Sequence, residues 1–271
     1  MIVLMDKKIF FFDLDGTLLN DEKKISDKTF EALKRFTDAG NLFAINTGRA
    51  LESAKNVQKE LGLNFKGAFL VCFNGAQIYD CDNDKMIRRD TIDLSIVKEI
   101  FDLANKFGIH AHTYTDDYII SPADDKELAF YRKAIKTPAK IVGDVPSFLT
   151  KAPSKCIAIE LEDLEKLERF RLEAKKIAPD KLSIMYSHPS YLELFPITAG
   201  KGSAVKSLCE YLGIPIENSM AAGDEQNDIS MIKAAGLGIA MKNAIDAVKK
   251  EANVITENDN NHDGLVPYLK V

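Results

Sequence analysis

The chain has 271 residues, of which 46% are hydrophobic and 28% are charged, and its formal net charge is −5. This is the balance of an ordinary globular protein with one large domain or two modest ones. The negative net charge disfavours a nucleic-acid partner, which requires a basic face. It does not exclude a small anionic substrate, because a local cluster of lysine and metal can hold one.

Neither the cysteines nor the N-terminal residues indicate export or membrane insertion. None of the cysteines forms a C-x-x-C pair, which argues against a zinc framework; they are Cys72, Cys81, Cys156 and Cys209. Cys72 and Cys156 lie within apolar runs, as buried reduced thiols do. The N-terminal residues lack the pattern of a signal peptide, and no segment is long enough to span a membrane. We therefore expect a cytoplasmic protein without a membrane partner, starting at Met1 or Met5.

The first third of the chain alternates between apolar strands and helices. Residues 9–12, 42–46 and 68–73 are short apolar runs, typical of strands that are covered on both faces. One predicted helix follows Ser26, which can cap it, and another covers residues 51–61. This β-α-β-α-β order predicts a parallel sheet with right-handed crossovers.

The middle of the chain has a different pattern, in which pairs of strands are joined by short turns. Two hairpins are predicted, from residues 110–114 with 118–121 and from residues 182–186 with 191–195. Between them, a strand at residues 155–161 precedes a charged helix at residues 162–177. Hairpins mixed with helices predict a separate α+β domain over residues 83–193.

The last part of the chain returns to the first pattern. Helices are predicted after Gly202 and over residues 228–235, with short strands at residues 219–222, 238–241 and 253–256. The simplest account is a doubly wound, Rossmann-like α/β core with a mostly parallel sheet. Residues 1–82 and 194–271 form this core, and residues 83–193 are inserted into it as an α+β cap.

The strongest chemical signal is the sequence Asp13-Leu14-Asp15-Gly16-Thr17, which directly follows the apolar strand KIFFF. This position places Asp13 and Asp15 at the carboxyl end of a parallel strand, where open α/β sheets build their sites. Residues two apart in an extended segment point the same way, so both carboxylates are expected to face one ligand. Gly16 allows the chain to turn away from the strand.

Two other predicted strands end in polar residues of the same kind. The strand LFAIN leads into Thr47, and the strand SMAA leads into Asp224 and Asp228. Parallel neighbours end at one edge of a sheet, so these residues are expected to converge with Asp13 and Asp15. Four carboxylates in one place repel one another unless a cation neutralises them. Their all-oxygen ligand set selects a hard ion such as Mg²⁺ rather than zinc.

Four motifs follow one another along the chain. They are DLDGT at residues 13–17, TGR at residues 47–49, the lysine of Lys201-Gly202, and GDEQND at residues 223–228. This set resembles the haloacid dehalogenase superfamily, and the large insert resembles its subfamily IIB, the Cof-type sugar-phosphate phosphatases. The resemblance covers essentially the whole chain. It implies a Mg²⁺-dependent phosphatase that hydrolyses small phosphate monoesters, sugar phosphates first, through a phospho-aspartate.

The resemblance also implies a role for each residue of the catalytic and metal sites. Asp13 is the nucleophile and a metal ligand, and Asp224 is a further metal ligand. Asp15 is the general acid and then the general base, and its backbone carbonyl also binds Mg²⁺. Lys201 neutralises the nucleophile and the phosphate, while Asp228 orients Lys201 or the waters of the metal site. A carboxyl group with both proton-transfer roles requires a pKa near neutrality in the free site, which is our hypothesis for Asp15.

The remaining candidates are phosphate-binding or substrate-binding residues. By resemblance, Thr47 and the Gly48 amide bind a phosphoryl oxygen, and Asn227 contacts the phosphate or a metal-bound water. Arg49 either binds a substrate anion or pairs with an acid of the core. Asn74 lies in an Asn-Gly turn after the third strand, and it either faces the substrate or only forms the turn.

Three other patterns receive a structural interpretation. His110 and His112 are two residues apart on a predicted strand, and we interpret them as surface residues of the cap sheet rather than as a metal pair. His188 is interpreted as part of a solvated turn. Residues 258–263, with the sequence NDNNHD, are interpreted as a polar loop and nothing more.

Two other functions stay open at this point. A phosphomutase or other phosphotransferase on the same scaffold would pass the phosphoryl group from Asp13 to a sugar hydroxyl. A regulatory module, resembling a bacterial receiver domain, would keep its phospho-aspartate; Asp15 and the large cap argue against it. In each enzymatic case the predicted partner is a small phosphorylated metabolite, whose identity stays open together with the oligomeric state.

Overall fold

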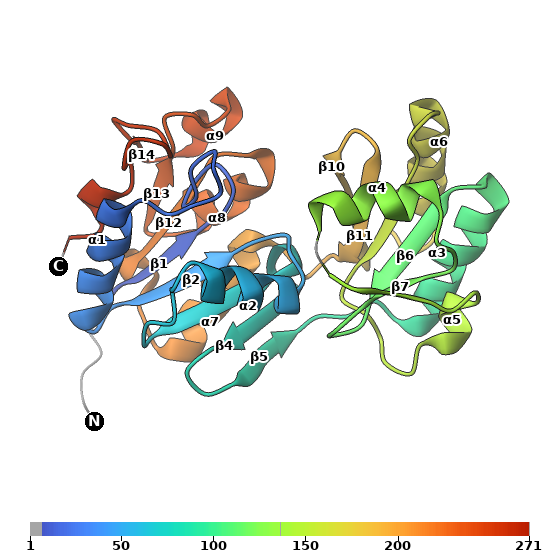
Figure 1. Cartoon of the computed structure of the whole chain (residues 1–271), viewed down its shortest axis with the longest axis horizontal. Coiled ribbons are helices and arrows are strands. Elements are labelled where there is room, and N and C mark those ends of the chain that lie inside the picture. The colour runs from blue at the N-terminus through green and yellow to red at the C-terminus, as the bar shows by residue number, and fades with distance from the viewer. Residues whose placement is uncertain (1–6, 136, 271) are drawn as a thin grey trace. The chain divides into compact units, whose positions relative to one another are not determined.

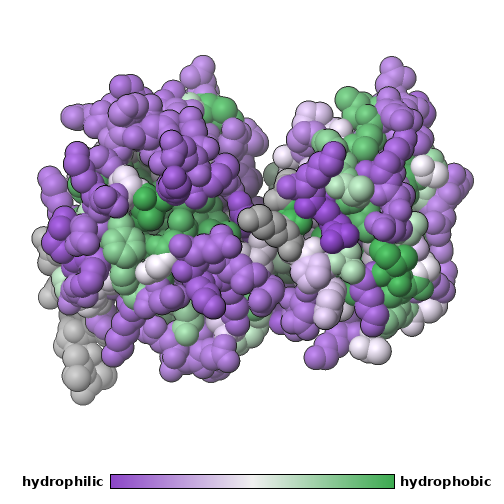
Figure 2. Space-filling view, in the orientation of Figure 1, coloured by the Kyte–Doolittle hydropathy of each residue, from purple (hydrophilic) through white to green (hydrophobic). Residues whose placement is uncertain are grey.

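The computed structural model describes residues 7–135 and 137–270, so both candidate start residues, Met1 and Met5, lie outside it. The chain divides into two compact units, residues 1–88 with 200–271 and residues 89–199 (Figure 1). Figure 2 shows mostly hydrophilic side chains on the visible face of each unit. Across the described residues, every helix is too short or too polar to cross a bilayer.

The first unit is built on an eight-stranded sheet. In spatial order its strands are β14 (Val254–Ile255), β13 (Leu237–Ala240), β12 (Ser219–Gly223), β1 (Ile9–Phe12), β2 (Leu42–Asn46), β3 (Ala68–Cys72), β4 (Gln77–Asp80) and β5 (Lys85–Arg89). The pairs from β14 to β3 are parallel, and β3 with β4 is antiparallel. The four residues of β1 are all buried, as expected for a central strand covered on both faces.

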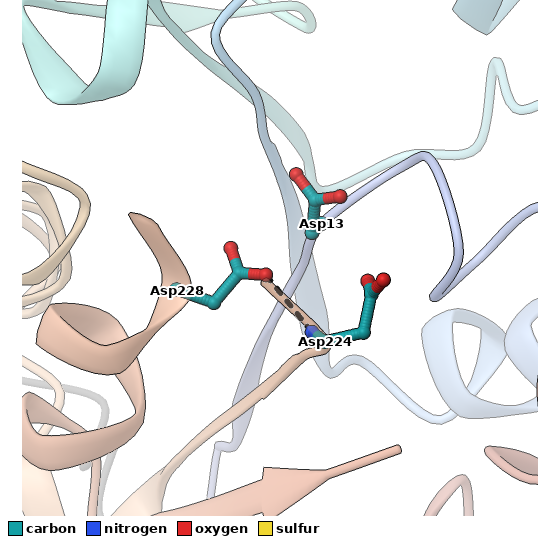
Figure 3. A group of neighbouring side chains, drawn as sticks. All are labelled: Asp13, Asp224 and Asp228. Carbon is teal, nitrogen blue, oxygen red and sulfur yellow. Dashed lines mark hydrogen bonds between the residues drawn. The ribbon is translucent and has the colours of Figure 1, made fainter. Parts of the chain in front are cut away.

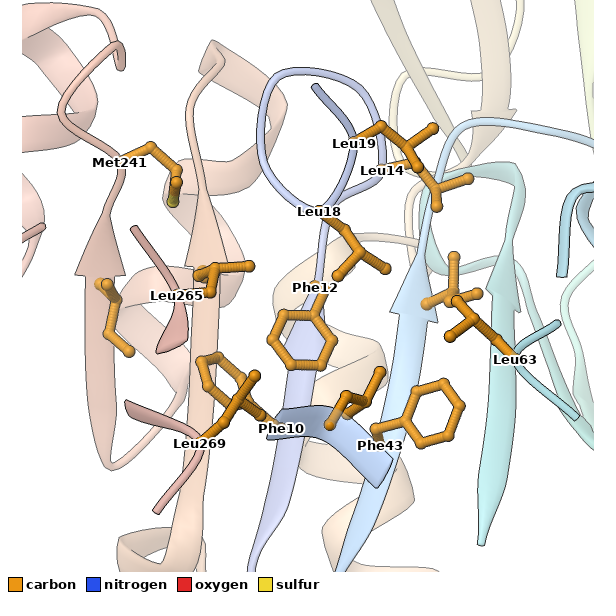
Figure 4. Close-up of a cluster of buried hydrophobic side chains, with 14 of the residues drawn as sticks. Phe10, Phe12, Leu14, Leu18, Leu19, Phe43, Leu63, Met241, Leu265 and Leu269 are labelled. Carbon is orange, nitrogen blue, oxygen red and sulfur yellow. The ribbon is translucent and has the colours of Figure 1, made fainter. Parts of the chain in front are cut away.

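Alternate residues of β1 pack into two different cores. The helices of this unit are α1 (Asp27–Asp38), α2 (Leu51–Glu60), α7 (Lys201–Leu212), α8 (Ile229–Ala234) and α9 (Asp246–Glu251). Phe10 and Phe12 pack on one face (Figure 4), in the cluster that also contains Phe36 of α1. Phe11 packs on the other face with Leu208 of α7. Helices therefore cover both faces of a mostly parallel sheet, and the predicted doubly wound α/β core is confirmed.

The second unit holds a six-stranded sheet with its own core. In spatial order its strands are β10 (Leu182–His188), β11 (Tyr191–Pro196), β9 (Cys156–Ile159), β6 (His110–Tyr114), β7 (Ile119–Ser121) and β8 (Ala139–Ile141). Its helices are α3 (Leu94–Phe107), α4 (Lys126–Ala134), α5 (Val145–Phe148) and α6 (Leu164–Ala174). Val97 of α3 and Phe170 of α6 pack with Leu192 of β11 in one buried cluster. Cys72 in the first unit and Cys156 in the second are buried thiols, as predicted, and burial raises the pKa of Cys156 to about 12.

The boundaries between the units lie a few residues later than the expected ones at 83 and 193. At the first boundary, β4 and β5 belong to the sheet of the first unit, and neither strand was predicted from the sequence. At the second, β11 continues to Pro196, where it pairs with Leu182 of β10. Sheet membership therefore places Arg88 in the first unit and residues 194–196 in the second, and residues 197–199 also belong to the second unit.

The interpretation of His110 and His112 as surface residues is wrong. Both are buried, and the His112 ring is fully inaccessible. The Nδ1 atom of His110 lies 2.7 Å from a carboxylate oxygen of Asp125, and its Nε2 atom lies 3.0 Å from Nδ1 of His112. Tyr131 of α4 packs against the His112 ring, with centroids 4.8 Å apart. The helix α4 thus covers part of a sheet face that the strand pattern alone predicted to be exposed to solvent.

We expect the second unit to lose stability in mild acid because of His112. Burial lowers the pKa of His112 well below 6.5, and the nearby charges of His110 and Lys155 lower it further. The unfolded chain takes up a proton on this residue near pH 6.5 and the folded unit does not, so the free energy of unfolding falls as the pH drops below 6.5. The loss between pH 7.5 and 5.5 is about 1.4 kcal/mol.

Urea unfolding of the wild type and His112→Asn at these two pH values measures this effect. The variant should lack this part of the pH dependence, because asparagine does not titrate in this range. Equal pH dependence in the two proteins would contradict the assignment.

Candidate active site

Three neighbouring parallel strands position the candidate residues at one edge of the sheet. Phe12 of β1 pairs with Ile45 of β2 and with Ala222 of β12. The strands therefore end side by side, and their next polar residues are Asp13, Thr47 and Asp224. The backbone N–H of Asp13 donates to the carbonyl of Ala222 at 3.1 Å, which extends the pairing by one residue.

Lys201 joins two of the carboxylates. It is the first residue of α7, and its side chain is fully buried. Its Nζ atom lies 2.5 Å from Oδ1 of Asp13 and 2.6 Å from Oδ1 of Asp228. Burial disfavours the ammonium ion, but the charges of Asp13 and then Asp228 outweigh this effect and raise the pKa of Lys201. The lysine is therefore held as a cation between two acids.

Asp228 is engaged through both carboxylate oxygens. Its Oδ1 atom accepts from Lys201, and its Oδ2 atom accepts from the backbone N–H groups of Asp224 and Glu225 at 2.9 and 3.0 Å. The side chain is fully buried. Asp228 thus fixes the loop that carries Asp224 and also fixes the lysine.

The carboxylates of Asp13, Asp224 and Asp228 are neighbours (Figure 3), and one oxygen from each lies within 4.8 Å of the others. Burial raises the pKa of Asp13 to about 7, against the opposing charge of Lys201. Burial raises the pKa of Asp224 to about 6, although a hydrogen bond from Thr17 opposes it. A hard cation would relieve this clustering of oxygen ligands, so these residues fit Mg²⁺.

Two residues of the DLDGT motif shape the position of Asp224. The hydroxyl of Thr17 donates to Oδ1 of Asp224 at 2.6 Å. Gly16 has a φ of +80°, and a Cβ atom there would lie 2.3 Å from Oδ2 of Asp224. Glycine is required at this position because a side chain would both strain the backbone and displace the acid. Thr17 was not among the predicted site residues, and its place inside the DLDGT motif is the sequence signal for this role.

The structure corrects the predicted position of the Asp15 side chain. Its carboxylate is not part of the acidic group but receives Arg49 Nη2 at 3.0 Å and Lys23 Nζ at 2.8 Å. The strand ends at Phe12 and the chain turns, so the rule that residues two apart face the same way does not hold for Asp13 and Asp15. Of the two alternatives for Arg49, the structure shows the ion pair with an acid.

The hypothesis of a near-neutral pKa for Asp15 is also wrong for this structure. Partial burial would raise the pKa of Asp15, but the hydrogen bond from Lys23 and the charge of Arg49 outweigh burial and lower it. Asp15 is therefore ionised at neutral pH in the free protein. Lys23 lies in a run of surface charges, and the sequence gives no sign of its contact with Asp15.

Thr47, Gly48, Asn74 and Asn227 form a second polar group at the same edge. The hydroxyl of Thr47 accepts from the backbone N–H of Arg49 at 3.3 Å. Asn74 has a left-handed backbone, with φ 54° and ψ 35°, and its N–H donates to the Thr47 carbonyl at 3.0 Å. Its Oδ1 atom accepts from Nδ2 of Asn227 at 3.3 Å.

The left-handed turn directs the Asn74 side chain toward Gly48. A Cβ atom on Gly48 would lie 3.2 Å from Oδ1 of Asn74, so glycine leaves room for the amide. Asparagine tolerates the left-handed conformation better than most residues. The Asn-Gly pair therefore reverses the chain and also places the Asn74 amide beside Gly48 and Asn227.

Known proteins are similar to this chain in both sequence and fold. The model of the haloacid dehalogenase-like hydrolases matches residues 10–269. The chain is 31% identical over 266 residues to the 5-amino-6-(5-phospho-D-ribitylamino)uracil phosphatase YcsE of Bacillus subtilis, covering 98% of this chain and 96% of that protein.

Two solved structures extend this comparison. A haloacid dehalogenase-like hydrolase from Bacteroides thetaiotaomicron has a TM-score of 0.89 and 30% identity, covering 97% of this chain and 98% of that one. The subclass IIB sugar phosphatase BT4131 has a TM-score of 0.76 and 23% identity, again covering 97% and 98%, so the two chains share a fold. The predicted resemblance is thereby confirmed, and the chain belongs to the haloacid dehalogenase-like hydrolase family.

Proposed function

We propose that this protein is a Mg²⁺-dependent phosphatase that hydrolyses small phosphate monoesters, with sugar phosphates as the first candidates. The observation that carries the proposal is the position of Asp13, which contacts the buried Lys201 ammonium and has a carboxylate oxygen within 4.8 Å of those of Asp224 and Asp228. A carboxylate attacks an anionic phosphate only where cations offset the repulsion. Relatives that match nearly the whole length of the chain are named phosphatases, which also supports hydrolysis of phosphate esters.

In the first step, an oxygen of Asp13 attacks phosphorus, and the bond between phosphorus and the ester oxygen breaks. Asp15 donates a proton to the leaving alcohol. In the second step, a water attacks phosphorus, gives its proton to Asp15, and restores the Asp13 carboxylate as phosphate leaves. Arg49 and Lys23 hold Asp15 ionised in the free protein, so its first proton has to arrive with the ester or after these ion pairs open.

The neighbouring residues position the reactants. Lys201 offsets the charge on Asp13 and on the phosphoryl oxygens, and Asp228 holds this lysine in place. Thr47 and the Gly48 amide would bind a phosphoryl oxygen, with Asn227 beside them. Each contact stabilises charge or alignment, on which phosphoryl transfer chiefly depends.

The metal would be held by Asp13, Asp224 and the backbone carbonyl of Asp15. When bound, Mg²⁺ would neutralise charge on the phosphoryl oxygens. Asp228 would orient Lys201 or the waters of the metal site, and its contact with Lys201 favours the first of these roles. We further propose that the second unit is the cap, which would exclude water and supply the contacts that select the substrate.

The first experiment measures phosphate release by the purified chain. The substrates are p-nitrophenyl phosphate, glucose 6-phosphate, mannose 6-phosphate, ribose 5-phosphate and pyridoxal 5′-phosphate, each with MgCl₂ and with EDTA. We expect turnover of several esters with Mg²⁺ and none with EDTA. No release across the panel by folded, Mg²⁺-loaded protein would contradict the proposal.

The same reactions separate the two rival functions. A phosphomutase would give an isomerised sugar phosphate and no free phosphate. A regulatory module would keep its phospho-aspartate far longer than the seconds expected of an enzyme intermediate. The product and the lifetime of the phosphorylated protein therefore decide among the three.

A further inference from the structure

The loop between β1 and α1 is held by two asparagines from the other end of the chain. Nδ2 of Asn243 donates to the carbonyl of Gly16 at 2.8 Å, and Nδ2 of Asn260 donates to the carbonyl of Leu19 at 2.9 Å. The backbone N–H of Asn260 also donates to Oδ1 of Asn243 at 3.2 Å. The polar loop NDNNHD, to which Asn260 belongs, therefore contacts the DLDGT motif through a short hydrogen-bonded chain.

Asn243 is tied to the Asp224 loop as well. It lies just after β13, in a segment where the backbone N–H of Ile245 donates to the Asp224 carbonyl at 3.0 Å. The Thr17 hydroxyl, one residue beyond Gly16, donates to the Asp224 side chain. Asn243 thus fixes the Gly16 peptide relative to Asp224 from outside both loops.

Apolar packing does not explain why an asparagine stands at position 243. The Asn243 side chain is exposed, so it contributes little apolar burial. Its carboxamide uses one end as a donor to Gly16 and the other as an acceptor from Asn260. Aspartate has nearly the same shape and keeps the acceptor, but it offers no donor and would place an oxygen against the Gly16 carbonyl.

We propose that Asn243 and Asn260 are positioning residues for phosphoryl transfer, which hold the loop that presents Asp15. This inference rests on the proposed function. Gly16 directly follows Asp15, and its carbonyl belongs to the peptide that joins it to Thr17, so a shift of this peptide reaches, through one residue, the carboxyl group that donates to the leaving alcohol. Asp13 and Lys201 are held by separate contacts, so attack on phosphorus depends less on the asparagines.

Because Asp15 and Asp13 have separate roles in the first step, the effect of the asparagine variants on the rate should depend on the leaving group. A sugar alkoxide leaves only with a proton, whereas p-nitrophenolate leaves readily without one. We expect Asn243→Asp to lower kcat/KM for the best sugar phosphate of the panel about 10- to 100-fold, since kcat/KM reports the first step, in which Asp15 protonates the leaving alcohol. The loss of kcat/KM with p-nitrophenyl phosphate should be several-fold smaller, because its first step does not need a proton from Asp15.

Steady-state kinetics and thermal unfolding of Asn243→Asp and Asn260→Asp test the proposal. The matched control is Asn253→Ala, which removes another side-chain bond to backbone, from Gly238 N–H at 2.7 Å, at the opposite end of β13. It should leave kcat/KM unchanged for both esters. Because aspartate keeps the size of the side chain, these variants measure the loss of the amide donor and not the loss of the whole side chain.

The outcomes distinguish this inference from the proposed function. A wild type without turnover of either ester contradicts the function itself. An active wild type whose two aspartate variants keep kcat/KM within twofold, or lose it equally on both esters, overturns the inference. Should Asn243→Asp not fold, Asn260→Asp decides by the same criteria. Failure of both variants to fold would show a structural role and would also overturn it.

Discussion

Replacement of Asp13 by asparagine is expected to lower turnover of every phosphate ester by at least about 10⁴-fold. Asparagine has nearly the same shape as aspartate but no carboxylate oxygen that can attack phosphorus. Lys201 keeps its 2.6 Å contact with Asp228, so the variant retains a partner for the buried ammonium. The loss should therefore come from chemistry rather than from unfolding.

Two measurements test this expectation. Initial rates of phosphate release from p-nitrophenyl phosphate with MgCl₂ give the loss of turnover. Acid quenching after mixing with labelled ester shows whether phosphate stays on the protein, which should occur with the wild type alone. Asp27→Asn, which changes an exposed acid of α1, is the matched control and should behave as the wild type. Retention of more than a hundredth of the turnover by the Asp13 variant would exclude Asp13 as the nucleophile.

The predicted edge of the sheet could be located from the sequence because strand direction is a strong constraint. The apolar runs before Asp13, Thr47 and Asp224 are buried on both faces, and parallel strands of this kind end together. No knowledge of side-chain geometry was needed to bring these positions to one edge. The order and direction of the strands are therefore sufficient to predict which residues lie at this edge of the sheet.

The orientation of individual side chains could not be predicted in the same way. The alternation rule holds only while the backbone stays extended, and the chain turns directly after Asp13. Asp15 consequently faces Lys23 and Arg49, which offset its charge and lower its pKa. A residue two positions from the nucleophile thus lies in a different electrostatic environment.

Contacts between polar residues that are far apart along the chain could not be predicted from the sequence either. Asn243 and Asn260 reach Gly16 and Leu19 across more than two hundred residues of chain. Such bonds follow no periodicity, because they depend on how the loops are placed after the sheet has formed. The loop NDNNHD was therefore interpreted as inert, although its hydrogen bonds lead to the edge that holds Asp13 and Asp224.

The second prediction with a large expected effect concerns Lys201. We expect Lys201→Met to lower the free energy of unfolding by about 3–5 kcal/mol in EDTA at neutral pH. Methionine has a similar length but no charge, so Asp13 and Asp228 would be left as buried acids without their shared cation. Turnover should fall about 10²- to 10³-fold with it, because the charge on the nucleophile and the phosphate is no longer offset.

The pH dependence of this loss has a defined sign. Lys201 lowers the pKa of Asp13, so the variant raises that pKa above its present value of about 7. An acid whose pKa is higher in the folded state than in the unfolded chain loses stabilisation as the pH rises through the folded value. The difference in stability between the wild type and Lys201→Met should therefore be smaller at pH 6 than at pH 8.5.

Urea unfolding in EDTA at these two pH values, and then with MgCl₂, tests the argument. Lys206→Met, an exposed lysine on the same helix, is the matched control and should change stability by less than about 0.5 kcal/mol. Mg²⁺ should stabilise the wild type and, where the carboxylates still bind it, offset part of the loss in Lys201→Met. The double variant Lys201→Met/Asp228→Asn removes one unpaired acid and should recover part of the loss. If Lys201→Met is as stable as the wild type at pH 8.5, the buried ammonium does not hold the acids together, and the electrostatic account of the site is wrong.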